Sequence, residues 1–183
     1  ILVKETSPGR EKFIAKFVKG PEWHDDPIAL FGDPSVLEVG DGWVKGGTSY
    51  AACIYDDEGT LIESLELDRA GADCSGRPCW RRLRSSGSGD RGYLYRDSAA
   101  SSDGLSLVKL LDTSRQTILI KGANNEGRGQ LDLPSGIAAE LLDSESVTIQ
   151  WVGSDSGWFG RDEGKCFSMT LDEIKKQDAE QFK

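Results

Sequence analysis

A chain of 183 residues is long enough to bury a hydrophobic core of its own, without metal ions or many disulfides to hold it together. Its net charge of −9 repels the phosphates of nucleic acids and of anionic membranes, so neither is expected as a partner. No apolar run approaches the length of a transmembrane helix. The 22 glycines are typical of short strands joined by tight turns.

The first part of the chain predicts short β-strands. Ile1–Lys4 reads as a strand, and so does Lys12–Lys19, where β-branched and aromatic residues outweigh a helix-like spacing. Val36–Val44 is expected to be a strand or an extended loop. The clearest signal is a hairpin that joins Ser49–Tyr55 to Thr60–Leu67 through an acidic Asp-Asp-Glu-Gly turn.

The stretch Cys79–Leu111 organises the second part, because it repeats the order strand, turn, strand. Gly92–Arg96 places Tyr93 and Tyr95 on one face of a strand and Leu94 on the other. Four further strands are expected over Leu105–Leu111, Thr117–Lys121, Val147–Val152 and Lys165–Leu171.

One helix is expected over Pro134–Leu142, where Ser135 is a suitable N-cap and the apolar residues share one face. The C-terminal segment is either a second short helix or a bent tail. The predicted fold is therefore mainly β: an antiparallel β-sandwich, jelly-roll or Greek-key like, with one or two short helices. It is read as a single domain over residues 1–183, since no linker is visible. A faint echo between KFIAKFVKG and QTILIKGAN reflects either two related halves or chance.

The four cysteines are an even number without a zinc-binding pattern. We expect all of them to be oxidised, with Cys74–Cys79 and Cys53–Cys166 as the favoured pairs. The alternative joins Cys53 to Cys74 and Cys79 to Cys166. Disulfides indicate an oxidising compartment, so the protein is expected to be extracellular, at the cell surface or periplasmic. The chain opens on a strand instead of a signal peptide, which we interpret as a mature, processed form.

No cofactor and no catalytic group is expected. Asp56, Asp57, Asp97 and Asp103 are weak calcium candidates, but acidic residues are common in turns, and none of these turns has the spacing of an EF-hand loop. A nucleophilic serine or cysteine needs a base. Such an enzyme would depend on His24, the only histidine of the chain, so we do not expect an enzyme.

The five tryptophans fall into two groups. Trp80 and Trp151 sit in strand-like segments and are expected in the core. Trp23, Trp43 and Trp158 lie among glycines and aspartates and are candidates for exposed rings that face a ligand, such as a sugar.

Several segments in the same order resemble an uncharacterised family of β-rich domains from predicted exported bacterial proteins. They span nearly the whole chain: ILVKETSPGREKFIAKFVK, DRAGADCSGRPCWRRL, RGYLYRDSAASSDGLSLVKLL, ILIKGANNEGRGQLDLPSGIAAEL and CFSMTLDEIKKQDAEQFK. The resemblance implies an exported, mostly β domain and assigns no activity.

Two classes of function follow. The first is a non-catalytic structural or adhesive protein of the cell surface, which acts by self-association or by docking on a larger assembly with a protein partner. The second is a β-sandwich module that binds carbohydrate or calcium. For the first class, Ile1–Lys4 is a candidate edge strand for addition between subunits. The simpler alternative is that this strand pairs within its own sheet.

Overall fold

The computed structural model is mainly β. Its described residues form 13 strands and no complete helix, and every pair of neighbouring strands is antiparallel. The structure describes residues 2–4, 11–18, 34–35, 38–40, 43–45, 47–85, 89–111, 117–124, 130–131, 133, 137, 146–154, 165–171 and 181–182.

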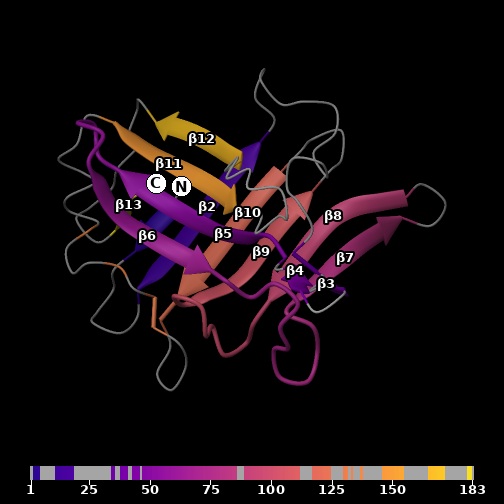
Figure 1. Cartoon of the computed structure of the whole chain (residues 1–183). Helices are drawn as coiled ribbons and strands as arrows, with labels where there is room; N and C mark the ends of the chain where they lie inside the picture. Colours follow the sequence, from indigo (N-terminus) through magenta and orange to yellow (C-terminus); the bar gives the residue numbers. More distant parts are fainter. Residues whose placement is uncertain are drawn as a thin grey trace.

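The larger of two main sheets has seven strands in the order β13-β1-β2-β10-β9-β8-β7 (Figure 1). They are β1 (Leu2–Lys4), β2 (Lys12–Val18), β7 (Trp80–Ser85), β8 (Gly89–Arg96), β9 (Leu105–Leu111), β10 (Thr117–Ala123) and β13 (Gln181–Phe182). Strands β7 to β10 are a meander, in which each strand pairs with the next. Strand β1 pairs with both β2 and β13, so the N-terminal strand is internal to the sheet and is not an open edge.

The second sheet has four strands in the order β12-β11-β5-β6. They are β5 (Ser49–Tyr55), β6 (Leu61–Leu67), β11 (Val147–Ser154) and β12 (Lys165–Leu171). The predicted hairpin is confirmed as β5 and β6, which pair directly. A separate two-stranded ribbon, β3 (Glu38–Gly40) with β4 (Trp43–Lys45), occupies most of the stretch that was expected as one strand or extended loop.

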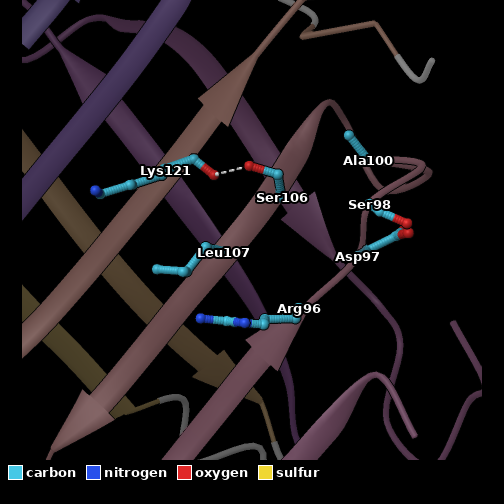
Figure 2. A pocket seen from close by; sticks show the side chains of 7 residues that line it. All are labelled: Arg96, Asp97, Ser98, Ala100, Ser106, Leu107 and Lys121. Carbon is cyan, nitrogen blue, oxygen red and sulfur yellow. Dashed lines mark hydrogen bonds between the residues drawn. The ribbon is translucent and has the colours of Figure 1, made fainter. Parts of the chain in front are cut away.

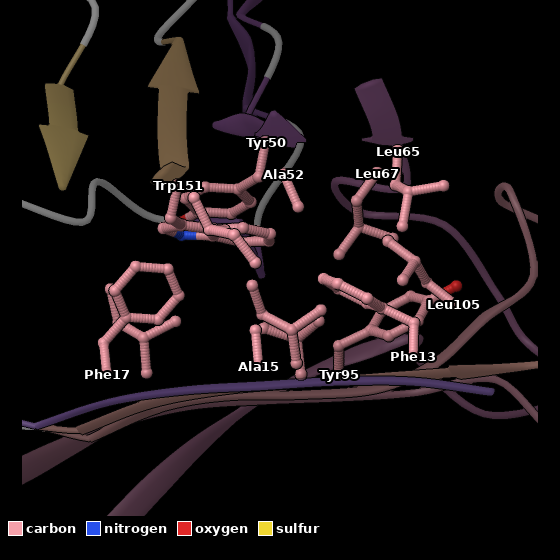
Figure 3. Packing of buried hydrophobic residues seen from close by; sticks show 14 of the residues in the cluster. Phe13, Ala15, Phe17, Tyr50, Ala52, Leu65, Leu67, Tyr95, Leu105 and Trp151 are labelled. Carbon is pink, nitrogen blue, oxygen red and sulfur yellow. The ribbon is translucent and has the colours of Figure 1, made fainter. Parts of the chain in front are cut away.

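Both main sheets contribute to one hydrophobic core. In β5, residues at every second position are buried, Tyr50, Ala52 and Ile54 among them, and β2 shows the same period. This period places alternate side chains on opposite faces of a strand. Figure 3 shows the buried residues of β5, β6 and β11 pointing toward those of the larger sheet. The ambiguous segment at Lys12 is therefore a strand, as predicted.

An aromatic series crosses this core. The ring of Trp151 on β11 stacks on Tyr50 at a centroid distance of 5.0 Å. Tyr50 contacts Trp80 of the other sheet at 5.4 Å, and Trp80 contacts Tyr95 at 5.3 Å. Pairs at these separations add to the stabilisation that comes from apolar burial. The prediction that Trp80 and Trp151 lie in the core is confirmed.

One disulfide is confirmed and one expectation about cysteine is wrong. Cys74 and Cys79 form a disulfide with an S–S distance of 2.01 Å, just before β7. Cys53 is a free thiol. It lies on β5 and Cys166 on β12, with β11 between them. Two strands that flank a third are about 9–10 Å apart, whereas a disulfide needs Cα atoms about 4.4–6.8 Å apart. The alternative Cys53–Cys74 pair is excluded by the observed bridge.

The helix expected at Pro134–Leu142 lies outside the described residues, apart from Ile137, which is buried in the core. The helix or tail expected near the C-terminus is described only at its ends, as the last residues of β12 and the two residues of β13.

Candidate functional site

The outward side chains of the seven-stranded sheet form a surface of unusual composition. In β2, Phe13, Ala15 and Phe17 are buried, so the residues between them lie on the opposite face; β10 alternates in the same way. We call the outward set over β2 and β7 to β10 the cationic face. Its members are Lys12, Ile14, Lys16, Val18, Arg81, Leu94, Arg96, Leu107, Lys109, Leu111, Thr117, Leu119, Lys121 and Ala123.

The charge of this face opposes that of the whole chain. The chain has 31 acidic and 22 basic residues, yet the members of the cationic face are only basic, apolar or, in one case, a threonine. The rest of the chain is therefore more acidic than the net −9 of the whole. A surface of one sign on a protein of the other sign attracts partners that resemble the rest of that protein.

Basic and apolar side chains alternate across the strands. Leu119 on β10 pairs with Lys16 on β2 and with Lys109 on β9. Lys109 in turn pairs with Leu94, and Leu94 with Arg81 on the edge strand. Like charges directly opposite one another destabilise a sheet, and the leucines keep them apart. Long basic side chains also leave their aliphatic stems on apolar neighbours while the charges stay in water.

A hollow of about 320 Å³ opens on this face where β8, β9 and β10 meet the β8–β9 turn. Leu107 pairs with Lys121 on one side and with Arg96 on the other, and both basic residues are exposed. Figure 2 shows these three side chains extending in the same direction from adjacent strands. The lining residues are Arg96, Asp97, Ser98, Ala100, Ser106, Leu107 and Lys121.

The carboxylate of Asp97, at the rim of the hollow, is engaged within the β8–β9 turn. Oδ1 accepts a hydrogen bond from the Ala99 amide at 2.8 Å. Oδ2 accepts bonds from the amide and hydroxyl of Ser101 at 2.7 and 2.6 Å, and from the Tyr95 hydroxyl at 3.4 Å. Asp97 is 2% exposed. Its negative charge is thus held by the turn and turned away from solvent.

This network shifts two pKa values in opposite directions. Burial acts to raise the pKa of Asp97, but the hydrogen bonds from Ser101 and Ala99 and the nearby charge of Arg69 outweigh burial and lower it. The pKa of Tyr95 is raised well above its ordinary value, first because the phenol is buried and then because the charge of Asp97 opposes a second anion. Asp97 is therefore ionised and Tyr95 neutral at physiological pH.

The same turn fastens the two main sheets to each other. The Glu66 amide on β6 donates to Oδ2 of Asp103 at 2.6 Å, and the Ser102 hydroxyl donates to the Glu66 carbonyl at 3.1 Å. Arg69 donates to the Ser101 carbonyl at 3.2 Å. The turn holds one wall of the hollow and is itself held by the opposite sheet, so the hollow is a preformed feature.

Three of the four aspartates named as calcium candidates accept hydrogen bonds from backbone amides. Asp97 and Asp103 use carboxylate oxygens to accept backbone amides, and Oδ1 of Asp56 accepts the Thr60 amide at 2.7 Å. Within the described ranges, no group of three or more His, Cys, Asp or Glu residues is placed to hold a metal ion. Asp57 is an exposed neighbour of Asp56 in the β5–β6 turn. The four candidates thus belong to two separate turns.

That β5–β6 turn is the most acidic exposed feature of the smaller sheet. We call residues Asp56–Thr60 the acidic tip. The tip is closed by the Asp56 amide on the Thr60 carbonyl at 3.1 Å and by the Gly59 amide on the Asp56 carbonyl at 3.3 Å. Glu58 is exposed, and Leu61, directly after the tip, is 51% exposed.

A second hollow, of about 260 Å³, lies at the start of β5. It is lined by Ser49, Tyr50, Ala51, Glu66, Asp68 and Val152. Its aromatic ring, Tyr50, is 4% exposed and stacked on Trp151 in the core, so it offers no open face to a sugar.

The side chains of the aromatic residues proposed to face a ligand lie outside the described part of the structure. Trp23 and Trp158 lie outside the described residues. Trp43 is the first residue of β4 and pairs with Gly40 in the ribbon; its side chain lies outside the description.

The cationic face was not predicted from the sequence. A signal for it exists, because a Lys or Arg lies two positions from an Ile or Leu in strand segments such as KFIAK, LVK and YLYR. The basic residues share a surface only when the strand order and register are known, and these bring β2, β10, β9, β8 and β7 side by side.

In the described part of the chain, no helix has the length and apolar character needed to cross a membrane. Comparison with models of protein families, with curated proteins and with solved structures finds no match to this chain.

Proposed function

We propose that this chain is a non-catalytic structural or adhesive protein, exported or displayed at the cell surface, that docks an acidic protein surface on its cationic face. The observation that carries the proposal is the segregation of charge: a face whose described members include no acidic residue, on a chain of net charge −9. Electrostatic complementarity of this kind speeds association and selects partners. By docking we mean either self-association or attachment to a larger assembly.

The architecture supports this role. The two main sheets share one core, and we propose that they form a β-sandwich of Greek-key or jelly-roll type. In a sandwich, the outward face of each sheet is free for contacts while the inward faces supply stability. The Cys74–Cys79 disulfide supports export, because such bonds persist in oxidising compartments.

The apolar members of the cationic face allow apolar contact with a partner in addition to charge attraction. Val18 is 57% exposed, and Ile14, Leu107 and Leu119 are half-buried between basic side chains. Interfaces of proteins combine apolar contact at the centre with polar contact at the rim. A face that mixes leucine, isoleucine and valine with lysine and arginine suits an acidic protein surface better than a purely polar polyanion.

The direct test measures binding of the protein to immobilised polyglutamate. We expect Lys16→Glu/Lys109→Glu to weaken binding about tenfold or more, as the loss of a few charged contacts does. Binding should also fall as salt approaches about 1 M, where the screening length is about 3 Å. The matched control is Arg77→Glu/Arg91→Glu, which changes the net charge equally at exposed residues outside the cationic face.

The outcome decides between two classes of partner. Equal loss in both variants would show that only net charge matters and would contradict the proposal. Preferential binding of an acidic polysaccharide such as polygalacturonate, through the same face, would replace protein docking by carbohydrate binding.

A further inference from the structure

We propose that the surface seated on the cationic face is the acidic tip of a second copy of this chain, and that the hollow between Arg96 and Lys121 receives one of its carboxylates. This inference rests on the proposed function and names the partner. It joins two features at different places in the fold: the outward face of the seven-stranded sheet and the end of the β5–β6 hairpin in the other sheet.

The hollow has the chemistry of a carboxylate receptor. Arg96 and Lys121 flank Leu107, both are exposed, and no salt bridge joins either side chain to another residue that the structure describes. Arginine binds carboxylates through two parallel hydrogen bonds, and lysine adds a point charge. The hydroxyls of Ser98 and Ser106 also line the hollow. Between the two cations, Leu107 supplies an apolar floor.

The carboxylate of Asp97, which lines the hollow, does not pair with Arg96 or Lys121. The oxygens of Asp97 accept four hydrogen bonds from Ala99, Ser101 and Tyr95, and its side chain is buried. Arg69, on the far side of the turn, is the basic residue whose charge acts on Asp97. Within the described part of the chain, Arg96 and Lys121 are therefore available to a carboxylate that comes from outside.

The acidic tip is a ligand with a fixed shape. Two backbone hydrogen bonds close it, and Asp56 adds a third by accepting the Thr60 amide on Oδ1. Gly59 takes the positive φ of 78° that the turn requires. Asp57 and Glu58 are exposed at its end. A rigid ligand loses little conformational entropy on binding, so a small contact is sufficient for measurable affinity.

The apolar groups are complementary as well. Among the residues that the structure describes, Val18 and Leu61 are the two exposed large hydrophobic side chains. One belongs to the cationic face and the other follows the acidic tip. Both surfaces thus pair charge with an exposed aliphatic group, as expected for two halves of one interface.

This contact is heterologous, because each copy would use two different surfaces. A copy that inserts its tip into a neighbour still presents its own hollow to a third copy. Such contacts build open chains unless the rotation between copies closes a ring. The predicted assembly is therefore a series of oligomers that grows with concentration, and not a dimer of fixed size.

The experiment uses two charge-reversed variants of the whole chain, a hollow variant (Arg96→Glu/Lys121→Glu) and a tip variant (Asp57→Lys/Glu58→Lys). Sedimentation velocity should show oligomers that grow with concentration for the wild type. Each variant alone should lose them, with the dissociation constant raised about tenfold or more. An equal mixture of their neutral counterparts, Arg96→Gln/Lys121→Gln and Asp57→Asn/Glu58→Gln, should give a single 1:1 heterodimer, because only the intact tip of the first and the intact hollow of the second can still pair.

The controls keep the result interpretable. Arg77→Glu/Arg91→Glu and Asp68→Lys/Asp73→Lys reverse the same number of charges at other exposed residues and should associate like the wild type. Thermal unfolding of each variant reports whether it is folded. If reversal to glutamate unfolds the hollow variant, Arg96→Gln/Lys121→Gln replaces it and should give the same loss.

The results separate this inference from the proposed function. If the tip variant associates like the wild type while the hollow variant does not, the acidic tip is not the partner, although the face remains a docking surface. A wild type that stays monomeric at millimolar concentration overturns the inference, whereas salt-dependent polyglutamate binding through Lys16 and Lys109 would still uphold the proposed function. A mixture of the two neutral variants without heterodimer also overturns it.

Discussion

The hydroxyl of Tyr95 donates to a carboxylate oxygen of Asp97, two residues later in the chain, at 3.4 Å, and both side chains are buried. Tyr95 ends the aromatic series that begins at Trp151 in the opposite sheet. Asp97 begins the turn that forms one wall of the hollow. The pair thus connects the hydrophobic core to the candidate site, and substitution of either residue should affect both.

Replacement of Asp97 by alanine should destabilise the protein. The amides of Ala99 and Ser101 and the hydroxyl of Tyr95 would each lose an acceptor. The Tyr95 hydroxyl is the buried donor of the three, and a buried donor left without an acceptor costs about 1–3 kcal/mol. Urea denaturation should show at least this loss for Asp97→Ala. Asp73→Ala, at an exposed aspartate, should change the free energy of unfolding by no more than about 0.5 kcal/mol.

The same carboxylate should make stability depend on acid pH. The pKa of Asp97 is lower in the folded state than its ordinary value, so the folded protein binds the proton less tightly than the unfolded chain. The resulting stabilisation is present above the ordinary value of about 3.9 and is lost as the pH falls through the folded pKa. Urea midpoints measured from about pH 5 downward should fall less steeply in Asp97→Asn than in the wild type. Parallel slopes for the two proteins would contradict this assignment.

Tyr95 should produce the opposite dependence at alkaline pH. Its folded pKa is raised, so the unfolded chain loses the phenol proton first. The stabilisation is complete below the ordinary value of about 10 and is lost as the pH rises above it. Tyr95→Phe removes the titrating group and should flatten the loss of stability in that range, at the expense of one hydrogen bond to Asp97. Unfolding measured by circular dichroism along an alkaline titration checks this.

The sequence could predict local strand pairs but not the order of strands. The hairpin of β5 and β6 follows from the alternation in SYAACIY and the acidic turn after it, both of which are local. The false Cys53–Cys166 pair came from two strands that are separated by β11, which is remote in sequence from β5. Which strands become neighbours depends on packing between distant segments, and no local pattern encodes it.

The candidate site shows the same limit. The aspartates singled out in the sequence act as acceptors for backbone amides, a role typical of turns. The hollow combines Arg96, Leu107 and Lys121, whose common surface depends on the register of three strands. An alternation of a basic residue with Leu is visible in each strand, but the surface that these residues share depends on the assembled sheet.

The cysteines give a prediction about covalent chemistry. Protein kept from reductant should carry the Cys74–Cys79 bridge, and iodoacetamide should label Cys53 once the chain is denatured. Cys74→Ser/Cys79→Ser should lower the free energy of unfolding by about 2 kcal/mol, because the bridge closes a short loop. Peptide mapping by mass spectrometry locates the bridge, and a Cys53 peptide found in a disulfide with Cys166 would contradict the strand order.

Two glycines at turns should respond differently to the same substitution. Gly104 and Gly59 both have positive φ, 69° and 78°, a conformation that costs an alanine about 1 kcal/mol or more. At Gly59 a new Cβ would meet no atom within 4 Å, so Gly59→Ala should lose only that conformational term. At Gly104 a new Cβ would overlap the backbone of Leu131, which packs over the β8–β9 turn. Gly104→Ala should therefore be destabilised well beyond Gly59→Ala in urea denaturation. Because this turn also forms the wall beside Ser98, the same variant should weaken binding at the hollow. Equal stability losses at the two glycines would mean that Leu131 does not lie against Gly104.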